Sequence, residues 1–322
     1  MKISALAILG FGRIAEVLYA PHLPNYSSGT VYICEPNSER YNRIKDFFPF
    51  AKIIDNVNML PSCQDSSSIA FNLLPGPDHQ ALNTELIHKG WNIFTEKPAA
   101  VSKHEWTKIV ELANRLGRVI VSAPVTCYMP EVDKIILDLY NNVIGDISEV
   151  HAQFFGGGPA RKGFVDESRK WFFEKDSCVI RDLGPYLVST TVRIFNPFDE
   201  FIWYRNMVRP EINVRPRGIV IPYYGIAACG LGKIGNTVIN LSIAYRSYMK
   251  KVESRIKIVG TKGEIELELD EQKENTSKQK VDVTFDLIFK CMNNNNFWRE
   301  HTNQVGETLN IINCLSVKTL YP

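Results

Sequence analysis

Short hydrophobic runs alternate with amphipathic segments along the first 123 residues of the chain. Runs of this kind are typical of parallel strands buried on both faces, and the segments between them have helical spacing. The predicted strands are Ile3–Leu9, Val31–Cys34, Ile69–Leu74, Asn92–Thr95 and Val119–Ser122. One predicted helix begins at Arg13, and three others cover Ser38–Phe47, His79–His88 and Lys103–Leu116. This order predicts an α/β unit built on a doubly wound parallel sheet.

The pattern changes after residue 123, where longer runs alternate β-branched and aromatic residues with polar ones. These runs predict a second, open sheet that is mostly antiparallel. Its predicted strands are Ile147–Phe155, Phe201–Val208, Ile219–Ala228, Thr237–Tyr245, Val252–Val259 and Glu264–Leu269. Asp270–Lys280 and Asn293–Asn296 are expected to form exposed loops, and Trp298–Leu315 a closing helix. We therefore expect two domains, residues 1–123 and an α+β domain of residues 124–322.

The charge balance excludes several classes of protein. The 322 residues carry 37 Lys and Arg against 35 Asp and Glu, with no block of like charges that could hold a nucleic acid. No stretch reaches the roughly 18 apolar residues of a membrane-spanning helix. The apolar run after Lys2 soon meets Arg13 and Glu16, which argues against a secretory signal. The seven cysteines form no C-x-x-C pair, so we expect no metal site, no disulfide framework and a cytoplasmic location.

The turn after the first strand reads G-x-G-x-x-A, from Gly10 to Ala15. Gly10 permits a sharp turn out of the strand, Gly12 lets a pyrophosphate approach the backbone, and Ala15 lets helix and strand pack closely. The N–H groups at the start of the helix, near Arg13 and Ile14, then face the anion. Because the motif lies between a buried strand and a helix, it predicts a dinucleotide site in a Rossmann domain.

Glu35 follows the second strand and indicates which dinucleotide binds. A carboxylate at this position accepts hydrogen bonds from both hydroxyls of the adenosine ribose and repels a 2′-phosphate. The sequence therefore favours NAD. Arg40, in the next predicted helix, is a cation that could reach a phosphate, so NADP stays an alternative. A solvated Glu35 at a strand end is the structural alternative.

A second motif, Thr95-Glu96-Lys97-Pro98, closes a strand that follows Lys89-Gly90. Together with G-x-G-x-x-A and Pro75–His79, it resembles the Gfo/Idh/MocA oxidoreductases, the family of glucose-fructose oxidoreductase and inositol dehydrogenase. The resemblance extends over nearly the whole chain. Its later elements are Trp171–Phe173, Asp182–Tyr186 and Gly260–Gly263.

The resemblance implies positions for several residues. Lys97 is expected between the nicotinamide and the substrate, with Glu96 supporting it, and the bond from Lys97 to Pro98 resembles one that is often cis in relatives. Leu74, Pro75 and His79 are expected beside the cofactor. A structural role at the start of a helix is the alternative for His79.

Hydride transfer from a carbinol carbon requires loss of the hydroxyl proton and stabilisation of the developing alkoxide. Lys97 can supply the positive charge. Relatives commonly carry D-x-G-x-H-x-x-D with a histidine as proton carrier, whereas this chain has Asp182, Gly184, Tyr186 and Ser189. The tyrosine resembles the branch with glucose-fructose oxidoreductase and dimeric dihydrodiol dehydrogenases, so Tyr186 is the expected proton carrier. A nearby ammonium would lower its pKa from the ordinary value of about 10. A ring packed in the core is the alternative.

Asp182 is a further catalytic candidate, because helical spacing places it on one face with Tyr186. It either contacts substrate or caps the helix. The glycine-rich segment Gly156–Lys162 has two cations and either holds a phosphorylated or nucleotide-linked sugar or forms a solvated loop. The candidate substrate contacts are Lys97, Tyr128, Trp171, Arg181, Asp182 and Tyr186.

The expected function is hydride transfer between NAD(P) and a carbinol or ketone carbon of a sugar, a nucleotide-linked sugar or a cyclitol. One alternative is reduction of a non-sugar ketone or imine, or oxidation of a dihydrodiol. The other is a non-catalytic regulatory protein that senses the dinucleotide. The sequence contains no helices to cover the outer face of the second sheet, so a homodimer or homotetramer through that sheet is expected.

Overall fold

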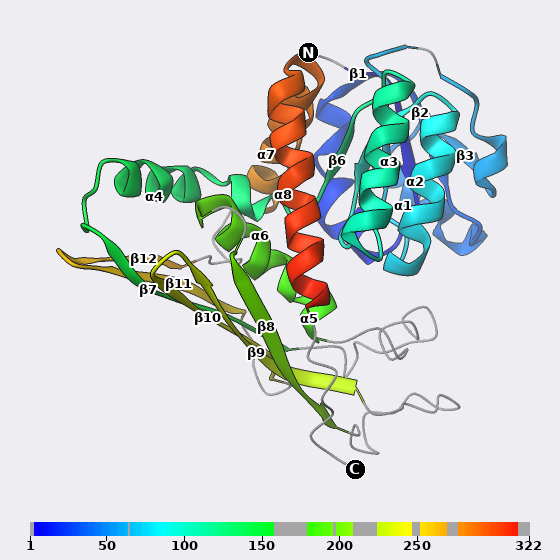
Figure 1. Cartoon of the computed structure of the whole chain (residues 1–322). Coiled ribbons are helices and arrows are strands. Elements are labelled where there is room, and N and C mark those ends of the chain that lie inside the picture. Colours follow the sequence, from blue (N-terminus) through cyan, green and yellow to red (C-terminus); the bar gives the residue numbers. More distant parts are fainter. Residues whose placement is uncertain are drawn as a thin grey trace. The chain divides into compact units, whose positions relative to one another are not determined.

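The computed structural model describes residues 3–63, 65–157, 179–195, 198–208, 224–246, 252–268 and 276–314 (Figure 1). The chain forms two compact units. The first comprises Met1–Val125 and Asn275–Gly306, and the second comprises Thr126–Glu274 and Glu307–Pro322. Within the described residues, each unit contains a sheet of six strands.

The first unit contains a parallel sheet with the strand order β3-β2-β1-β4-β5-β6. Its strands are β1 (Ile3–Leu9), β2 (Ser27–Cys34), β3 (Lys52–Ile54), β4 (Ile69–Asn72), β5 (Asn92–Thr95) and β6 (Ile120–Ser122). The connecting helices include η1 (Ala15–Tyr19), α1 (Tyr41–Phe47), α2 (His79–His88) and α3 (Lys103–Arg115). This is the strand order of the doubly wound fold that binds dinucleotides, so the predicted fold class is confirmed.

Burial explains which strands the sequence predicts well. All four residues of β4 and all four of β5 are buried, and these strands match the hydrophobic runs closely. The short β3 lies at the edge of the sheet and contains no fully buried residue. Its sequence therefore has no hydrophobic run that would have predicted a strand. β2 also begins earlier than predicted, because Ser27 and the exposed Thr30 already pair with Ile3 and Ala5 of β1.

The C-terminal helices differ most from the prediction. Helix α7 (Thr276–Asn293) was not predicted and occupies part of the expected loop Asp270–Lys280, and α8 (Asn295–Asn313) begins within the other expected loop. Val281 and Phe285 of α7 are fully buried, and the ring of Phe285 stacks on Tyr26 with 3.8 Å between the centroids.

Helix α8 is also attached to the first sheet in its N-terminal part. Trp298 donates from Nε1 to the carbonyl oxygen of Ile120 at 2.9 Å, and His301 accepts from the Ser122 amide at 3.1 Å. The division of the chain therefore differs from the expected continuous domain of residues 124–322. Residues 275–306 return to the first unit, because their amphipathic helices bury aromatic side chains against it.

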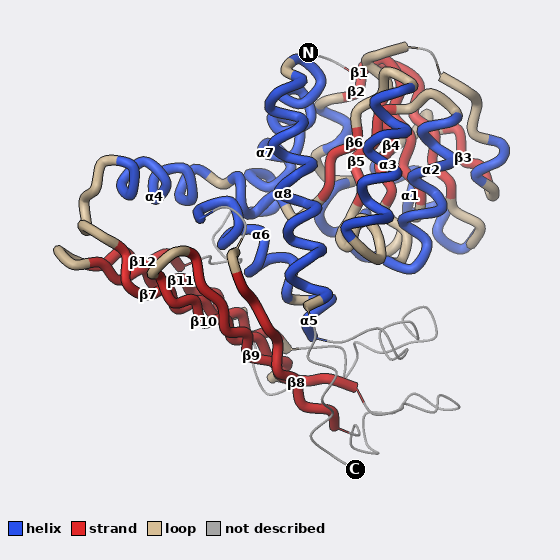
Figure 2. Tube along the Cα trace, in the orientation of Figure 1, coloured by secondary structure: helices blue, strands red, loops and turns tan. Residues whose placement is uncertain are grey.

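The second unit contains a mixed sheet with the order β12-β11-β7-β10-β9-β8. Its strands are β7 (Ile147–Gly156), β8 (Glu200–Val208), β9 (Tyr224–Ile234), β10 (Thr237–Tyr245), β11 (Glu253–Gly260) and β12 (Glu264–Glu268). β7 and β10 pair in parallel, and the other neighbours pair antiparallel. Its helices are α4 (Pro130–Tyr140), α5 (Val179–Asp182) and α6 (Gly184–Phe195), of which α4 was not predicted. Figure 2 shows α5 and α6 on one face of this sheet.

β9 was predicted to end at Ala228 but continues to Ile234. Gly230 and Gly232 interrupt its hydrophobic pattern, yet both are needed in the strand. A Cβ atom on Gly230 would lie 2.3 Å from the ring of Phe201, and one on Gly232 would lie 2.5 Å from the same ring. The glycines thus make room for aromatic side chains of the neighbouring strand. The residues predicted to begin this strand, 219–223, lie outside the described residues.

Candidate functional site

The G-x-G-x-x-A turn has the geometry that close approach of an anion requires. Gly10 has a φ of +86°, and a Cβ there would lie 2.9 Å from Cδ2 of Leu74 and 3.3 Å from the carbonyl oxygen of Leu73. No heavy atom lies within 4 Å of the Cβ position of Gly12, so the space in front of it is open. Arg13 and Ile14 are exposed at the start of the helix. These features fit a bound pyrophosphate.

Glu35 is held at the end of β2 by three donors from the chain itself. Its Oε2 accepts from the Phe11 amide and from Nη1 of Arg40, both at 3.0 Å, and its Oε1 accepts from the Asn37 amide at 2.9 Å. Glu35 is only 3% exposed. The carboxylate therefore lies directly behind the glycine turn, as a ribose-binding residue would. Glu35 is therefore not a solvated side chain at a strand end, which was the structural alternative.

His79 links two loops that the resemblance assigns to the cofactor site. Its Nε2 lies 2.7 Å from the carbonyl oxygen of Leu74, and its Nδ1 lies 2.9 Å from the carbonyl oxygen of Pro98. The ring is 1% exposed. His79 thus connects the loop at Pro75 with the loop that follows Lys97. This is a structural role, and it also holds the Pro75 turn close to the E-K-P motif.

The carboxylate of Glu96 contacts Tyr19 with one oxygen and the main chain of the E-K-P motif with the other. Its Oε1 accepts from the hydroxyl of Tyr19 at 2.7 Å, and its Oε2 accepts from the main-chain N–H of Lys97 at 3.1 Å. The Glu96 amide donates to the carbonyl oxygen of Asn72 at 3.0 Å. The peptide bond between Lys97 and Pro98 is cis, in agreement with the resemblance. The first unit therefore brings together all the predicted cofactor residues with Lys97 at the ends of β1, β2, β4 and β5.

In the second unit, Asp182 and Tyr186 lie on consecutive helices rather than on one. α5 ends at Asp182 and α6 begins at Gly184, so the continuous helix face expected for them is interrupted at Leu183. Oδ2 of Asp182 accepts from the hydroxyl of Tyr245 in β10 at 2.9 Å. The ring of Tyr186 stacks on Phe154, with 5.3 Å between the centroids.

Tyr128 and Arg181, two other substrate candidates, contact side chains that lie far from them in the sequence. The guanidinium of Arg193 lies 4.4 Å from the ring centroid of Tyr128 and donates to Asp133 at 2.7 Å. Arg181 donates from Nη2 to Oδ1 of Asn313 at 3.4 Å. These contacts fix both residues within the second unit. Trp171, the remaining candidate, lies outside the described residues.

Tyr19 and Tyr245 are the main residues near the predicted site that the sequence did not indicate. Each donates its hydroxyl to a carboxylate of a recognised motif, Glu96 or Asp182. Neither tyrosine belongs to a motif, and its partner is more than 60 positions away in the sequence. The sequence could have indicated these contacts only through the tyrosines themselves, because a phenol that is removed from water generally needs a hydrogen-bond partner.

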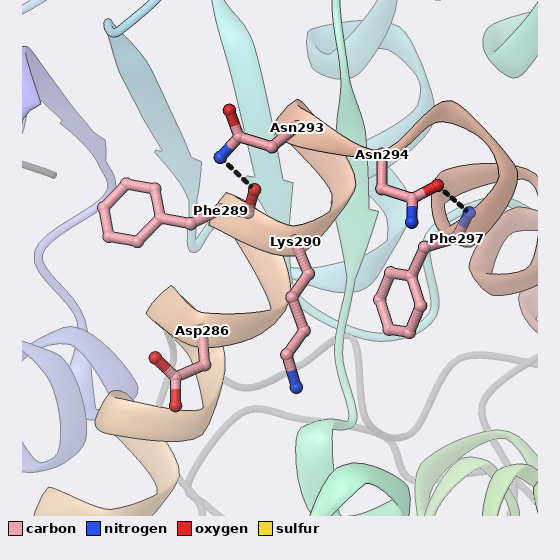
Figure 3. Close-up of a pocket in the computed structure, with 6 residues that line it drawn as sticks. All are labelled: Asp286, Phe289, Lys290, Asn293, Asn294 and Phe297. Atoms are coloured by element: carbon pink, nitrogen blue, oxygen red, sulfur yellow. Dashed lines mark hydrogen bonds between the residues drawn. The ribbon is translucent and has the colours of Figure 1, made fainter.

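A separate pocket lies on the hairpin of α7 and α8 (Figure 3). It has a volume of about 570 Å³ and is lined by Asp286, Phe289, Lys290, Asn293, Asn294 and Phe297. None of the predicted site residues is among them. Within the described part of the chain, no cluster of His, Cys, Asp and Glu is arranged to hold a metal ion. Nor do those residues include a helix that is long and apolar enough to cross a membrane.

Solved structures share this fold over nearly their whole length. GenD2 from gentamicin A biosynthesis, solved with NAD, has a TM-score of 0.80 and 12% identity, covering 98% of this chain and 93% of GenD2. The WlbA dehydrogenase of Bordetella pertussis, solved with NADH and UDP-GlcNAcA, has a TM-score of 0.73 and 13% identity, covering 94% and 93%. A myo-inositol dehydrogenase of Corynebacterium glutamicum has a TM-score of 0.72 and 13% identity, covering 97% and 96%.

None of the curated protein sequences compared with the chain matches it significantly. Family comparisons do match both units. Residues 5–123 match the oxidoreductase family with an NAD-binding Rossmann fold, and residues 139–266 match the GFO/IDH/MocA C-terminal domain. The chain therefore belongs to the Gfo/Idh/MocA family of NAD-binding oxidoreductases.

Proposed function

We propose that this oxidoreductase transfers a hydride between NAD and a carbinol or ketone carbon of a sugar, a nucleotide-linked sugar or a cyclitol. The proposal rests on the hydrogen bonds around Glu96. The Glu96 carboxylate holds the backbone of Lys97 at the edge of the sheet where the strands end and the dinucleotide motif lies. When bound, NAD would accept the hydride from an alcohol, and NADH would donate it to a ketone.

In this proposal the chain supplies charge and a proton carrier. The ammonium of Lys97 stabilises the oxygen of the substrate as negative charge develops on it, and the hydroxyl of Tyr186 takes up or returns the proton. Asp182 holds a substrate hydroxyl on one side while Tyr245 orients its carboxylate. Tyr128 and Arg181 line the substrate side. Lys97 belongs to the first unit, and the other five residues belong to the second.

The substrate class is supported by the functions named for two proteins of the same fold. One is a myo-inositol dehydrogenase, and another was solved with UDP-GlcNAcA. A polyhydroxylated substrate also suits a site whose candidate residues are an ammonium, a carboxylate, a guanidinium and phenols, because each can bond a hydroxyl group. The non-sugar substrates and the purely regulatory function remain the competing hypotheses.

A panel experiment tests the proposal directly. The chain is mixed with NAD and free sugars, cyclitols, nucleotide-linked sugars or dihydrodiols. It is also mixed with NADH and the matching sugar ketones or simple ketones, and nicotinamide absorbance is followed. We expect turnover with at least one polyhydroxylated compound. Turnover of dihydrodiols or simple ketones alone would contradict the substrate class. Tight NADH binding without turnover of any compound would favour the regulatory hypothesis.

Cofactor preference provides a second test, based on the buried carboxylate of Glu35. We expect NADH to bind at least about tenfold more tightly than NADPH, roughly 1.4 kcal/mol. Glu35→Ser should narrow this difference, because it removes the repulsion and releases Arg40 for a 2′-phosphate. Glu39→Ser, which changes a nearby carboxylate, is the control and should preserve the preference. Fluorescence titration measures both dissociation constants, and equal or tighter NADPH binding by the unmodified chain would refute the assignment.

We also propose that the outer face of the second sheet binds a second copy of the chain. Ile202, Leu231 and Val238 are 38%, 47% and 56% exposed there, and Ile202 pairs with Leu231 across β8 and β9. Such an exposed apolar patch is normally covered in an oligomer. Leu231→Glu is expected to shift the protein toward 36.6 kDa in sedimentation velocity, whereas Val17→Glu in the first unit should not. An unmodified chain that sediments only as a monomer at micromolar concentration would exclude this interface.

A further inference from the structure

A buried phenol connects the helix of the dinucleotide motif with the E-K-P motif. The hydroxyl of Tyr19 donates to Oε1 of Glu96 at 2.7 Å. The ring of Tyr19 is 2% exposed and lies edge-on against Phe71 and Phe94, with centroid distances of 5.6 and 5.8 Å. These two rings fix the direction of the phenol, and a charged acceptor makes its hydrogen bond strong.

The other oxygen of the same carboxylate faces the backbone of Lys97. Oε2 of Glu96 accepts from the Lys97 N–H at 3.1 Å, and the Glu96 amide is itself anchored to the carbonyl oxygen of Asn72 at 3.0 Å. A carboxylate is planar and rigid, so holding one oxygen restricts where the other can lie. The Tyr19 hydroxyl therefore helps to place the acceptor for the Lys97 amide.

The helix that carries Tyr19 is widened at this point. Residues Ala15–Tyr19 form a π-helical turn, in which the Ala20 amide donates to the carbonyl oxygen of Ala15 at 2.7 Å. A π turn holds one residue more than an α turn and changes the face on which the following side chains lie. Such turns are frequent at functional sites. Here the turn begins at the last residue of the G-x-G-x-x-A motif and ends at the phenol that reaches Glu96.

We propose that Tyr19 is a positioning residue for Lys97. Its hydroxyl fixes the Glu96 carboxylate, and that carboxylate fixes the backbone from which the Lys97 side chain extends. The role of Lys97 in hydride transfer rests on the proposed function, whereas the two hydrogen bonds are properties of the first unit alone. In this proposal Tyr19 acts on the reaction through Glu96.

Tyr19→Phe is the decisive variant, because it removes one oxygen atom and keeps the ring against Phe71 and Phe94. Tyr26→Phe is a matched control in the same unit. Tyr26 also donates to a carboxylate, that of Asp282, and its ring stacks on Phe285. Burial and the neighbouring Asp282 raise the pKa of Tyr26 to about 12, so it is a protonated donor. The control thus loses the same kind of bond to a carboxylate that lies outside the E-K-P motif.

The first measurement is hydrogen exchange of the Lys97 amide in the full chain without substrate. Tyr19→Phe should speed this exchange by about tenfold, and Tyr26→Phe should change it by less than about twofold. The second measurement is turnover. Tyr19→Phe should lower kcat by about five- to tenfold with the KM for NAD within about twofold, and the double variant with Glu96→Gln should be no worse than Glu96→Gln alone.

Two results would overturn the proposal. One is unchanged exchange at Lys97 in Tyr19→Phe, and the other is equal acceleration in Tyr26→Phe, which would indicate general loosening of the unit. If the unmodified chain turned over no substrate, the proposed function would fail by itself. The exchange measurement would then still decide whether Tyr19 positions the Lys97 backbone.

Discussion

Replacing Tyr186 with phenylalanine is expected to lower the rate of hydride transfer by about 10² to 10⁴, the usual contribution of general acid–base catalysis. The ring can keep its stacking on Phe154, so the fold of the second unit should persist. Only the hydroxyl that is proposed to carry the proton is removed. Because Tyr186 belongs to the second unit and the dinucleotide motif to the first, NADH affinity should stay within about threefold. Single-turnover nicotinamide absorbance measures the rate.

Lys97→Ala is expected to be at least as damaging, since it removes the charge that is proposed to stabilise the developing alkoxide. The double variant should then be little slower than Lys97→Ala alone, because groups that act as one unit have non-additive effects. Tyr140→Phe is the matched control, as Tyr140 in α4 is 86% exposed and its loss of a hydroxyl should not change the rate. An unchanged rate in Tyr186→Phe would leave that side chain with a packing role only, and strictly additive losses would show that the two residues act independently.

Trp298→Ala is expected to destabilise the first unit by about 3–5 kcal/mol in its free energy of unfolding. Trp298 is 4% exposed, and its indole N–H donates to the carbonyl oxygen of Ile120 in β6. The substitution leaves both a cavity and a buried carbonyl oxygen without this donor. Urea denaturation followed by circular dichroism measures the loss.

Two variants separate the contributions to that loss. Trp298→Phe keeps most of the ring, so its cost should fall to about 1–3 kcal/mol, the penalty of an unpaired buried acceptor. Phe50→Ala removes an aromatic ring that is 96% exposed and should stay within about 0.5 kcal/mol. A loss of less than about 1 kcal/mol in Trp298→Ala would mean that α8 contributes little to the stability of the first unit.

The first sheet was predictable because its strands are local hydrophobic runs. β1, β4 and β5 are buried over most of their length, and the sequence shows this without any knowledge of their neighbours. The turn at Gly10 was predictable for a similar reason, since a positive φ next to Leu73 and Leu74 admits only glycine readily. The position of Glu35 behind that turn follows from the order of strands.

The candidate site was predictable only as far as its motifs extend. The sequence identified Lys97, Glu96 and Asp182, but not the tyrosines that hold the two carboxylates. These contacts join residues that are 77 and 63 positions apart. No periodicity or spacing encodes a pair at such a separation, because it depends on which strand ends become neighbours in the folded sheet.

The alternation of strands and helices, the glycine turn, the acidic end of β2 and the E-K-P motif follow from local sequence, because each depends on residues close together in the chain. That α7 and most of α8 complete the first unit follows only from long-range packing. The helices bury Phe285 and Trp298 there. Amphipathic helices show that they need an apolar partner, but their sequence does not say which surface will cover them. The same limit applies to Tyr19, whose phenol needed a partner that only folding could bring to it.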